Sequence, residues 1–145
     1  QMATLNRAAR DVLVEYPVHS CTDVTGFALL GHSFEMAQGS GCTLHIQAHA
    51  VPFHPEALEL ARMGFIPAGA YRNREYAQAG VQVNGQVELA LEDLFYDPQT
   101  SGGLLAAVPE ECADECLERL LAAGVEAARI GYVTEQQDAA VYLED

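Results

Sequence analysis

The order of apolar and polar positions along the chain predicts a mixture of helices and strands. Apolar residues three and four positions apart predict helices over 4–15, 27–38, 56–63, 88–95 and 110–123. Alternating positions or short apolar runs predict strands over 42–47, 81–83, 104–108, 130–134 and 140–143. The segment 18–23 is too short to assign as a strand, and 65–71 is expected to be irregular. Without internal repeats, this irregular order favours an α+β fold in which helices cover a mixed β-sheet.

Length and charge narrow the class of protein. With 145 residues, 50% of them apolar, one domain spanning 1–145 is the expectation. No apolar run approaches the ~20 residues that a membrane-spanning helix needs. The formal net charge of -14 makes nucleic acids and anionic membranes poor partners, and we expect a cytoplasmic protein.

The types of reactive side chain set further limits. The four cysteines form no C-x-x-C pair, so we interpret them as reduced thiols that lie mostly in the core. The five histidines are too loosely spaced for a zinc-binding helix. All seven basic residues are arginines, so any chemistry that needs a lysine must take it from another chain or domain.

A lone carboxylate, Asp23, lies between two threonines just before the helix predicted at 27–38. In the functional interpretation this carboxylate binds Mg2+, which prefers oxygen ligands and is usually held by only one or two protein carboxylates. In the structural interpretation Asp23 or Thr25 is the N-cap of that helix. Spacing alone favours the N-cap, because capping is common among these residue types.

Two further stretches each have a functional and a structural interpretation. The loop 97–103 either lines a ligand site, with glycines that admit an anion to the backbone, or is an ordinary turn. It lacks the lysine and the spacing of a phosphate-binding P-loop. Residues 72–74 contain two arginines, which either bind phosphate or form salt bridges with Glu75.

Three stretches together resemble one enzyme family. Residues 21–32 (CTDVTGFALLGH) closely resemble a motif in the C-terminal domain of selenophosphate synthetases, also called selenide, water dikinases. Residues 95–105 (FYDPQTSGGLL) resemble a second motif of that family, and residues 66–74 (IPAGAYRNR) a third. The resemblance covers essentially the whole chain, in order. It implies the layered fold of the C-terminal domain in aminoimidazole ribonucleotide synthetase-like proteins.

The resemblance also implies an activity and its partners. The family phosphorylates selenide with ATP, giving selenophosphate, AMP and phosphate, in a cleft between two domains that binds Mg2+. It implies that Asp23 is a metal ligand and that no residue of this chain is catalytic, since the family's nucleophile and lysine lie in an N-terminal domain. Full-length members are generally homodimers. The nucleotide-binding residues that we assign by resemblance are Thr22, Thr25, Gly26, Ser101 and Gly102.

The chain departs from the family in two ways. Ala28 stands where the family usually has glycine, which we expect to be a small change within the helix. The N-terminal domain and the opening segment of the C-terminal domain are missing, so we expect this chain alone to be inactive. Two alternatives remain open: a non-catalytic binding or regulatory domain, and another ATP-dependent enzyme of the same fold family.

Overall fold

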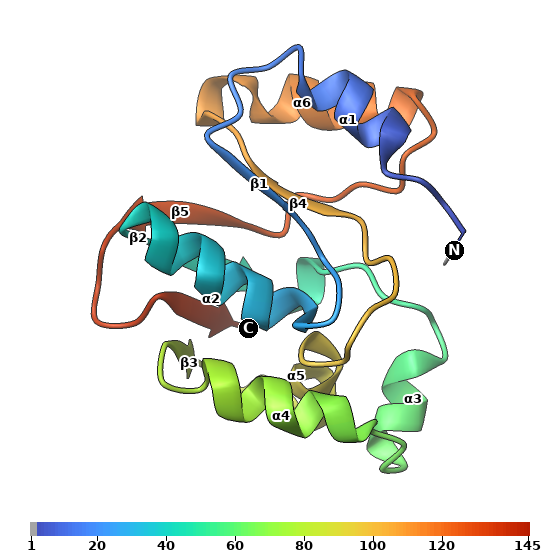
Figure 1. Cartoon of the computed structure of the whole chain (residues 1–145), viewed down its shortest axis with the longest axis vertical. Coiled ribbons are helices and arrows are strands. Elements are labelled where there is room, and N and C mark those ends of the chain that lie inside the picture. The colour runs from blue at the N-terminus through green and yellow to red at the C-terminus, as the bar shows by residue number, and fades with distance from the viewer. Residues whose placement is uncertain (1–2) are drawn as a thin grey trace.

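The structure is a computed structural model and describes residues 3–145 (Figure 1). Its helices are α1 (Arg7–Leu13), α2 (Ala28–Ser40), α3 (Ala57–Arg62), α4 (Ala68–Ala77), α5 (Leu89–Phe95) and α6 (Glu110–Ala122), with a 3-10 turn η1 (Ala48–Ala50). Its strands are β1 (Ser20–Asp23), β2 (Cys42–Gln47), β3 (Val81–Val83), β4 (Leu104–Ala107), β5 (Gly131–Glu135) and β6 (Val141–Glu144). None of the helices within 3–145 combines the length and the apolar character that a membrane crossing requires.

A four-stranded sheet forms the centre of the molecule, in the order β3-β6-β2-β5. Strand β2 runs antiparallel to β5 and parallel to β6, and β3 runs parallel to β6. The fold is therefore α+β with a mixed sheet, as the sequence predicts.

The two faces of this sheet are covered differently. Leu44 and Ile46 of β2 join the hydrophobic core that helices α2, α4 and α5 complete. Side chains alternate between faces along a strand, so His45 points to the opposite face. There the His45 ring stacks between Tyr132 and Tyr142, its register partners on the flanking strands, with ring centroids 4.5 Å and 5.2 Å away. Helices thus cover one face, and a row of aromatic rings lines the other.

A second, two-stranded ribbon connects this body to a separate pair of helices. Strands β1 and β4 pair antiparallel, with Asp23 opposite Leu104. Figure 1 shows the ribbon running from α1 and α6, which lie side by side at one end of the molecule, to the N-terminal end of α2. The short segment before Asp23 is therefore a strand because β4 supplies its hydrogen-bonding partner.

Two helix boundaries differ from the sequence prediction. The expected irregular segment 65–71 contains the start of α4, which begins at Ala68 after an extended Pro67. The buried face of α4 consists of Ala70, Asn73 and Ala77, so it has too little apolar bulk to be recognised as a helix from sequence. Helix α1 begins at Arg7, with Asn6 as its N-cap, and not at residue 4 as the sequence predicts.

The expectation that Ala28 is a small change within a helix is wrong. Ala28 is the first residue of α2 and has a left-handed backbone, with φ of 64°. For an L-residue other than glycine this conformation costs roughly 1–2 kcal/mol. Ala28 is also completely buried (0% exposed), so its methyl group packs in the core while its backbone is strained.

The strain at Ala28 can be tested by comparing the stability lost in Ala28→Gly with the stability lost in Ala37→Gly. Ala37 lies in the same helix, is equally buried, and has a residue of the same type. Each substitution loses a buried methyl group worth about 0.8 kcal/mol. Ala37→Gly adds the helix-interior cost of glycine, for a total loss of about 2 kcal/mol. Ala28→Gly relieves the left-handed strain, so we expect its free energy of unfolding to fall by less than about 0.5 kcal/mol.

Urea denaturation of the two variants and the parent chain measures both changes. Equal losses of stability at the two positions would show that the Ala28 backbone carries no strain.

Candidate functional site

The two most distinctive sequence motifs meet in space. We call residues 22–26 the 22–26 turn and residues 97–103 the 97–103 loop. Three backbone hydrogen bonds join them: Val24 N–H donates to the Gly103 carbonyl (3.0 Å), Gly102 N–H to the Val24 carbonyl (2.9 Å), and Gln99 N–H to the Thr25 carbonyl (3.0 Å). The turn and the loop therefore form one surface at the end of the β1–β4 ribbon.

Glycine at two positions allows this close approach. A Cβ atom on Gly102 would lie 2.9 Å from the Val24 carbonyl oxygen and 3.0 Å from Val24 Cγ1, both too close for undisturbed contacts. A Cβ atom on Gly69, in the first turn of α4, would lie 2.5 Å from Cγ of Pro98. Small residues thus bring the turn, the loop and α4 together.

Asn73 on α4 connects all three segments. Its side chain is buried, and its Nδ2 group donates to the Gly26 carbonyl (2.9 Å) and to the Tyr96 carbonyl (3.0 Å). The Tyr96 carbonyl is buried, and a buried carbonyl without a partner costs about 1–3 kcal/mol, so this amide stabilises the position of the turn relative to the residue that precedes the loop. The three stretches that resemble one family in sequence therefore converge on one place.

Asp23 lies exposed at the end of β1, beside this junction. Helix α2 has Phe27 as its N-cap, without a side-chain capping bond, so the N-cap interpretation of Asp23 and Thr25 is wrong. Within residues 3–145, no side chain hydrogen-bonds or ion-pairs with the Asp23 carboxylate. Over the same residues no three His, Cys, Asp or Glu side chains are grouped as a metal site. Asp23 therefore has the donor chemistry of one magnesium ligand, and the chain offers no complete metal site around it.

Two of the hydroxyl groups assigned by resemblance already donate within the chain. Thr22 Oγ1 donates to the Asp23 carbonyl (3.1 Å), and Ser101 Oγ donates to the Thr4 carbonyl (3.4 Å). Their oxygen lone pairs remain able to accept from a ligand. Thr22 lies on the 22–26 turn and Ser101 on the 97–103 loop. Gly26, the last residue of the turn before α2, is exposed.

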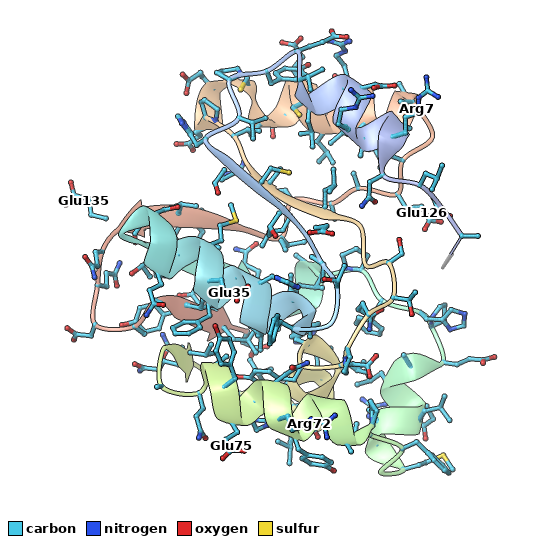
Figure 2. The ribbon with its side chains drawn as sticks, in the orientation of Figure 1. Arg7, Glu35, Arg72, Glu75, Glu126 and Glu135 are labelled. Carbon is cyan, nitrogen blue, oxygen red and sulfur yellow. The ribbon has the colours of Figure 1, made fainter. Side chains whose placement is uncertain are left out.

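Within the basic cluster of residues 72–74, Arg74 is not free to bind phosphate. The two terminal nitrogens of Arg74 form ion pairs with Glu92 and with Asp93, the latter at 2.6 Å. Its guanidinium also lies over the Tyr96 ring, 4.7 Å from the ring centroid. Burial lowers the pKa of Arg74, but these carboxylates outweigh it and raise the pKa overall. For Arg74 the salt-bridge interpretation is therefore correct, with α5 carboxylates as the partners instead of Glu75, which is exposed on α4 (Figure 2). Arg72 is exposed.

The cysteine nearest to Asp23 is not activated as a nucleophile. Partial burial, followed by the negative charge of Asp23, raises the pKa of the Cys21 thiol. All four cysteines are free thiols in the structure, as expected, but only Cys116 is fully buried. The expectation that they lie mostly in the core is therefore wrong.

Sequence reasoning missed two groups that shape this site. Asn73 was overlooked because it lies between the two arginines of the basic cluster. Alanines three positions before it and four positions after it are the signal that places it on the inner face of a helix. His32 lies 3.2 Å from Thr25 and 3.2 Å from Glu35. The spacing of three between His32 and Glu35 on a predicted helix is the signal that could have found this pair.

Comparison with known proteins adds sequence relatives to this geometry. The model of the family described as AIR synthase related protein, C-terminal domain, matches residues 1–144. The selenide, water dikinase of Pelobacter propionicus is 48% identical over 136 residues, which are 93% of this chain and 39% of that protein. Selenide, water dikinase 2 of Peptoclostridium acidaminophilum is 46% identical over 143 residues, which are 98% of this chain and 41% of that protein.

These matches confirm the resemblance seen in the motifs. The chain spans about two fifths of the length of the relatives it matches (39% and 41%). Among solved structures, Hydrogenase Maturation Protein HypE matches 92% of this chain and 34% of its own, with a TM-score of 0.57 and 24% identity. At that identity the match supports the α+β fold alone.

Replacing Asn73 by alanine should loosen the junction. The substitution removes the donor from the buried Tyr96 carbonyl and from the less buried Gly26 carbonyl, so we expect a loss of about 1–3 kcal/mol in the free energy of unfolding. Arg72→Ala, at the neighbouring exposed position, should change it by less than about 0.5 kcal/mol. Urea denaturation measures both, and equal effects would contradict the role of the Asn73 amide.

The loop also predicts a pH-dependent stability. Burial raises the pKa of Asp97 above its ordinary value, against an opposing hydrogen bond that Gln99 Nε2 donates to its Oδ2 at 2.6 Å. Because the folded pKa is the higher one, this contribution to stability is complete below the unfolded pKa of 3.8. The stability that protonated Asp97 contributes is lost as the pH rises through the pKa of this carboxyl in the folded state.

The variant Asp97→Asn keeps an acceptor for Gln99 and cannot ionise. We therefore expect it to gain stability relative to the parent chain as the pH rises from about 3.5 to 7, with no gain at the acid end. Denaturation midpoints of both proteins across this range give the difference. A constant difference would contradict the raised pKa of Asp97.

Proposed function

Because the chain belongs to the family of AIR synthase related proteins, C-terminal domain, we propose that it is the C-terminal domain of an ATP-dependent selenide, water dikinase. The complete enzyme converts selenide, ATP and water into selenophosphate, AMP and phosphate. In this proposal the rest of the enzyme is an N-terminal domain that supplies the nucleophile, a lysine and further metal ligands. The full-length enzyme is a cytoplasmic homodimer.

One observation carries the proposal. The three stretches that resemble the dikinase motifs, far apart in the sequence, come together through the Asn73 amide and the backbone bonds between Val24 and residues 102 and 103. At their junction lies the exposed Asp23 carboxylate, which has no side-chain partner among residues 3–145. The ATP complex of the HypE structure supports a nucleotide as the ligand of this fold.

Magnesium fits this junction as a shared ion. The Asp23 carboxylate would supply one oxygen ligand, and the remaining ligands would come from the N-terminal domain and from phosphate oxygens. When bound, the ion neutralises charge that develops on the phosphoryl groups.

The chain's own residues act by binding and orienting. Asp23 fixes one point of the metal–nucleotide complex from the end of a strand whose partner strand is β4. Gly26 and Gly102 are exposed and carry no side chain, so they admit the nucleotide close to the backbone. The oxygens of Thr22, Thr25 and Ser101 accept hydrogen bonds from it. No residue of this chain attacks or is phosphorylated, so the chain alone is inactive.

A chimeric enzyme tests the proposal. In it, this chain replaces the matching 136-residue segment of the Pelobacter propionicus relative. We expect AMP formation from ATP that depends on selenide and Mg2+ in the chimera, and none with the isolated chain. Turnover by the isolated chain would contradict the two-domain site.

Two other outcomes would favour the alternatives. Kinase activity on a small molecule, without dependence on selenide, would favour another ATP-dependent enzyme. A folded chimera without nucleotide turnover would favour a binding domain.

Asp23→Asn in the chimera tests the metal ligand. We expect kcat/KM for ATP to fall about 100-fold and the Mg2+ concentration for half-maximal rate to rise, with thermal unfolding unchanged. Asp114→Asn is the control, because this carboxylate is 90% exposed on α6 and its nearest ion-pair partner is 3.8 Å away. Equal rates for the two variants would remove Asp23 from the site.

A further inference from the structure

A hydroxyl, an imidazole and a carboxylate lie in line beside the 22–26 turn. Thr25 Oγ1 is 3.2 Å from His32 Nε2, and His32 Nδ1 is 3.2 Å from Glu35 Oε2. His32 and Glu35 are three residues apart on α2, so they share one face of the helix, and Glu35 is labelled there in Figure 2. Neither residue belongs to the nucleotide and metal ligands proposed above.

The surroundings hold this row of groups in place. The His32 side chain is 10% exposed, and the Phe27 ring packs edge-on against it with centroids 5.8 Å apart. Tyr76 of α4 donates its hydroxyl proton to Glu35 Oε1 at 3.2 Å, and its ring packs against Phe27. Glu35 is therefore oriented from α4 while it contacts His32, so a second helix fixes the imidazole.

Hydrogen-bonding chemistry gives each contact a direction. A carboxylate only accepts, so His32 Nδ1 must carry the proton that it donates to Glu35. In the neutral ring Nε2 then has a lone pair, and it accepts the hydroxyl proton of Thr25. The Thr25 oxygen keeps its own lone pairs but has no proton left to donate.

We propose that His32 and Glu35 are positioning residues that hold the Thr25 hydroxyl as a hydrogen-bond acceptor for the ligand of the 22–26 turn. This assignment rests on the proposed function for the identity of that ligand. An acceptor at Thr25 pairs with a donor, such as a nucleotide hydroxyl or amino group or a metal-bound water. It repels an unprotonated phosphate oxygen. Thr25 therefore selects a donor group of the metal–nucleotide complex and not its bare phosphates.

The direction of the bonds is measurable in the 145-residue chain itself, whatever its activity. Imidazole 15N chemical shifts distinguish a protonated from an unprotonated ring nitrogen. In the neutral ring we expect His32 to carry its proton on Nδ1. Thr25→Val should shift the Nε2 resonance, because it loses its donor, and Glu35→Ala should give a mixture of tautomers.

His49 is the internal control for this measurement. Its Nε2 lies 2.9 Å from Asp145 Oδ1, so the same chemistry predicts a proton on Nε2, the opposite tautomer. A proton on Nε2 of His32 would overturn the proposal, as would an Nε2 resonance that does not change in Thr25→Val.

Kinetics in the chimera test what the orientation does for the ligand. Thr25→Val and His32→Asn should each raise KM for ATP about tenfold, with kcat nearly unchanged. In the double variant KM should rise no further than in either single variant, because both substitutions remove the same interaction.

A rescue variant and a control accompany these two. His32→Gln places an amide near the former Nε2 and should restore most of the affinity for ATP, while His49→Asn should leave KM unchanged. Additive losses, or no rescue by glutamine, would indicate a merely structural histidine and overturn the proposal.

The two proposals fail separately. If the chimera makes no AMP, the proposed function fails, and the tautomer measurement still decides whether His32 holds Thr25 as an acceptor. If the chimera is active but the tautomer or the kinetic coupling is wrong, only the positioning role fails.

Discussion

The pairing of the 22–26 turn with the 97–103 loop is the constraint on which the rest of the site depends. Val24 is buried, and both its N–H and its carbonyl are satisfied by the loop. Buried backbone groups must find partners, so the loop cannot move away without a large cost. The register of the β1–β4 ribbon, the need for glycine at position 102 and the position of Asp23 all follow from these bonds.

The distribution of charge complements this framework. The chain is strongly acidic, and two of its few arginines, Arg62 and Arg74, are held in ion pairs with α5 or the residue before it. Phosphate groups at the junction would therefore meet a carboxylate and backbone groups, while Arg62 and Arg74 are already occupied. Neutralisation by a metal ion and by another domain is the arrangement that fits such a surface.

The sequence predicted most elements whose pattern is set by bulky residues. The central strand β2 was predicted with its observed bounds, because its positions alternate and Gly41 ends the preceding helix. Helix α4 was not predicted, because two alanines and an asparagine form its buried face. The left-handed backbone of Ala28 could not be predicted, since only tertiary contacts force a residue other than glycine into that conformation. For the site, motif resemblance proposes Asp23 and the loop as candidates, whereas the links through Asn73 and His32 required three-dimensional structure.

The distance in sequence between the two halves of the junction has a consequence for biosynthesis. Gly102 follows Val24 by roughly 80 residues, so at about 5–20 residues per second the ribosome makes the loop several seconds after the turn. During that interval Val24 has neither of its backbone partners and β1 has no neighbouring strand. The nascent chain therefore exposes this unpaired edge to chaperones or to other nascent chains until β4 emerges. The surface that carries Asp23 therefore cannot become ordered until β4 has been synthesised, although the central sheet waits longer still for β5 and β6.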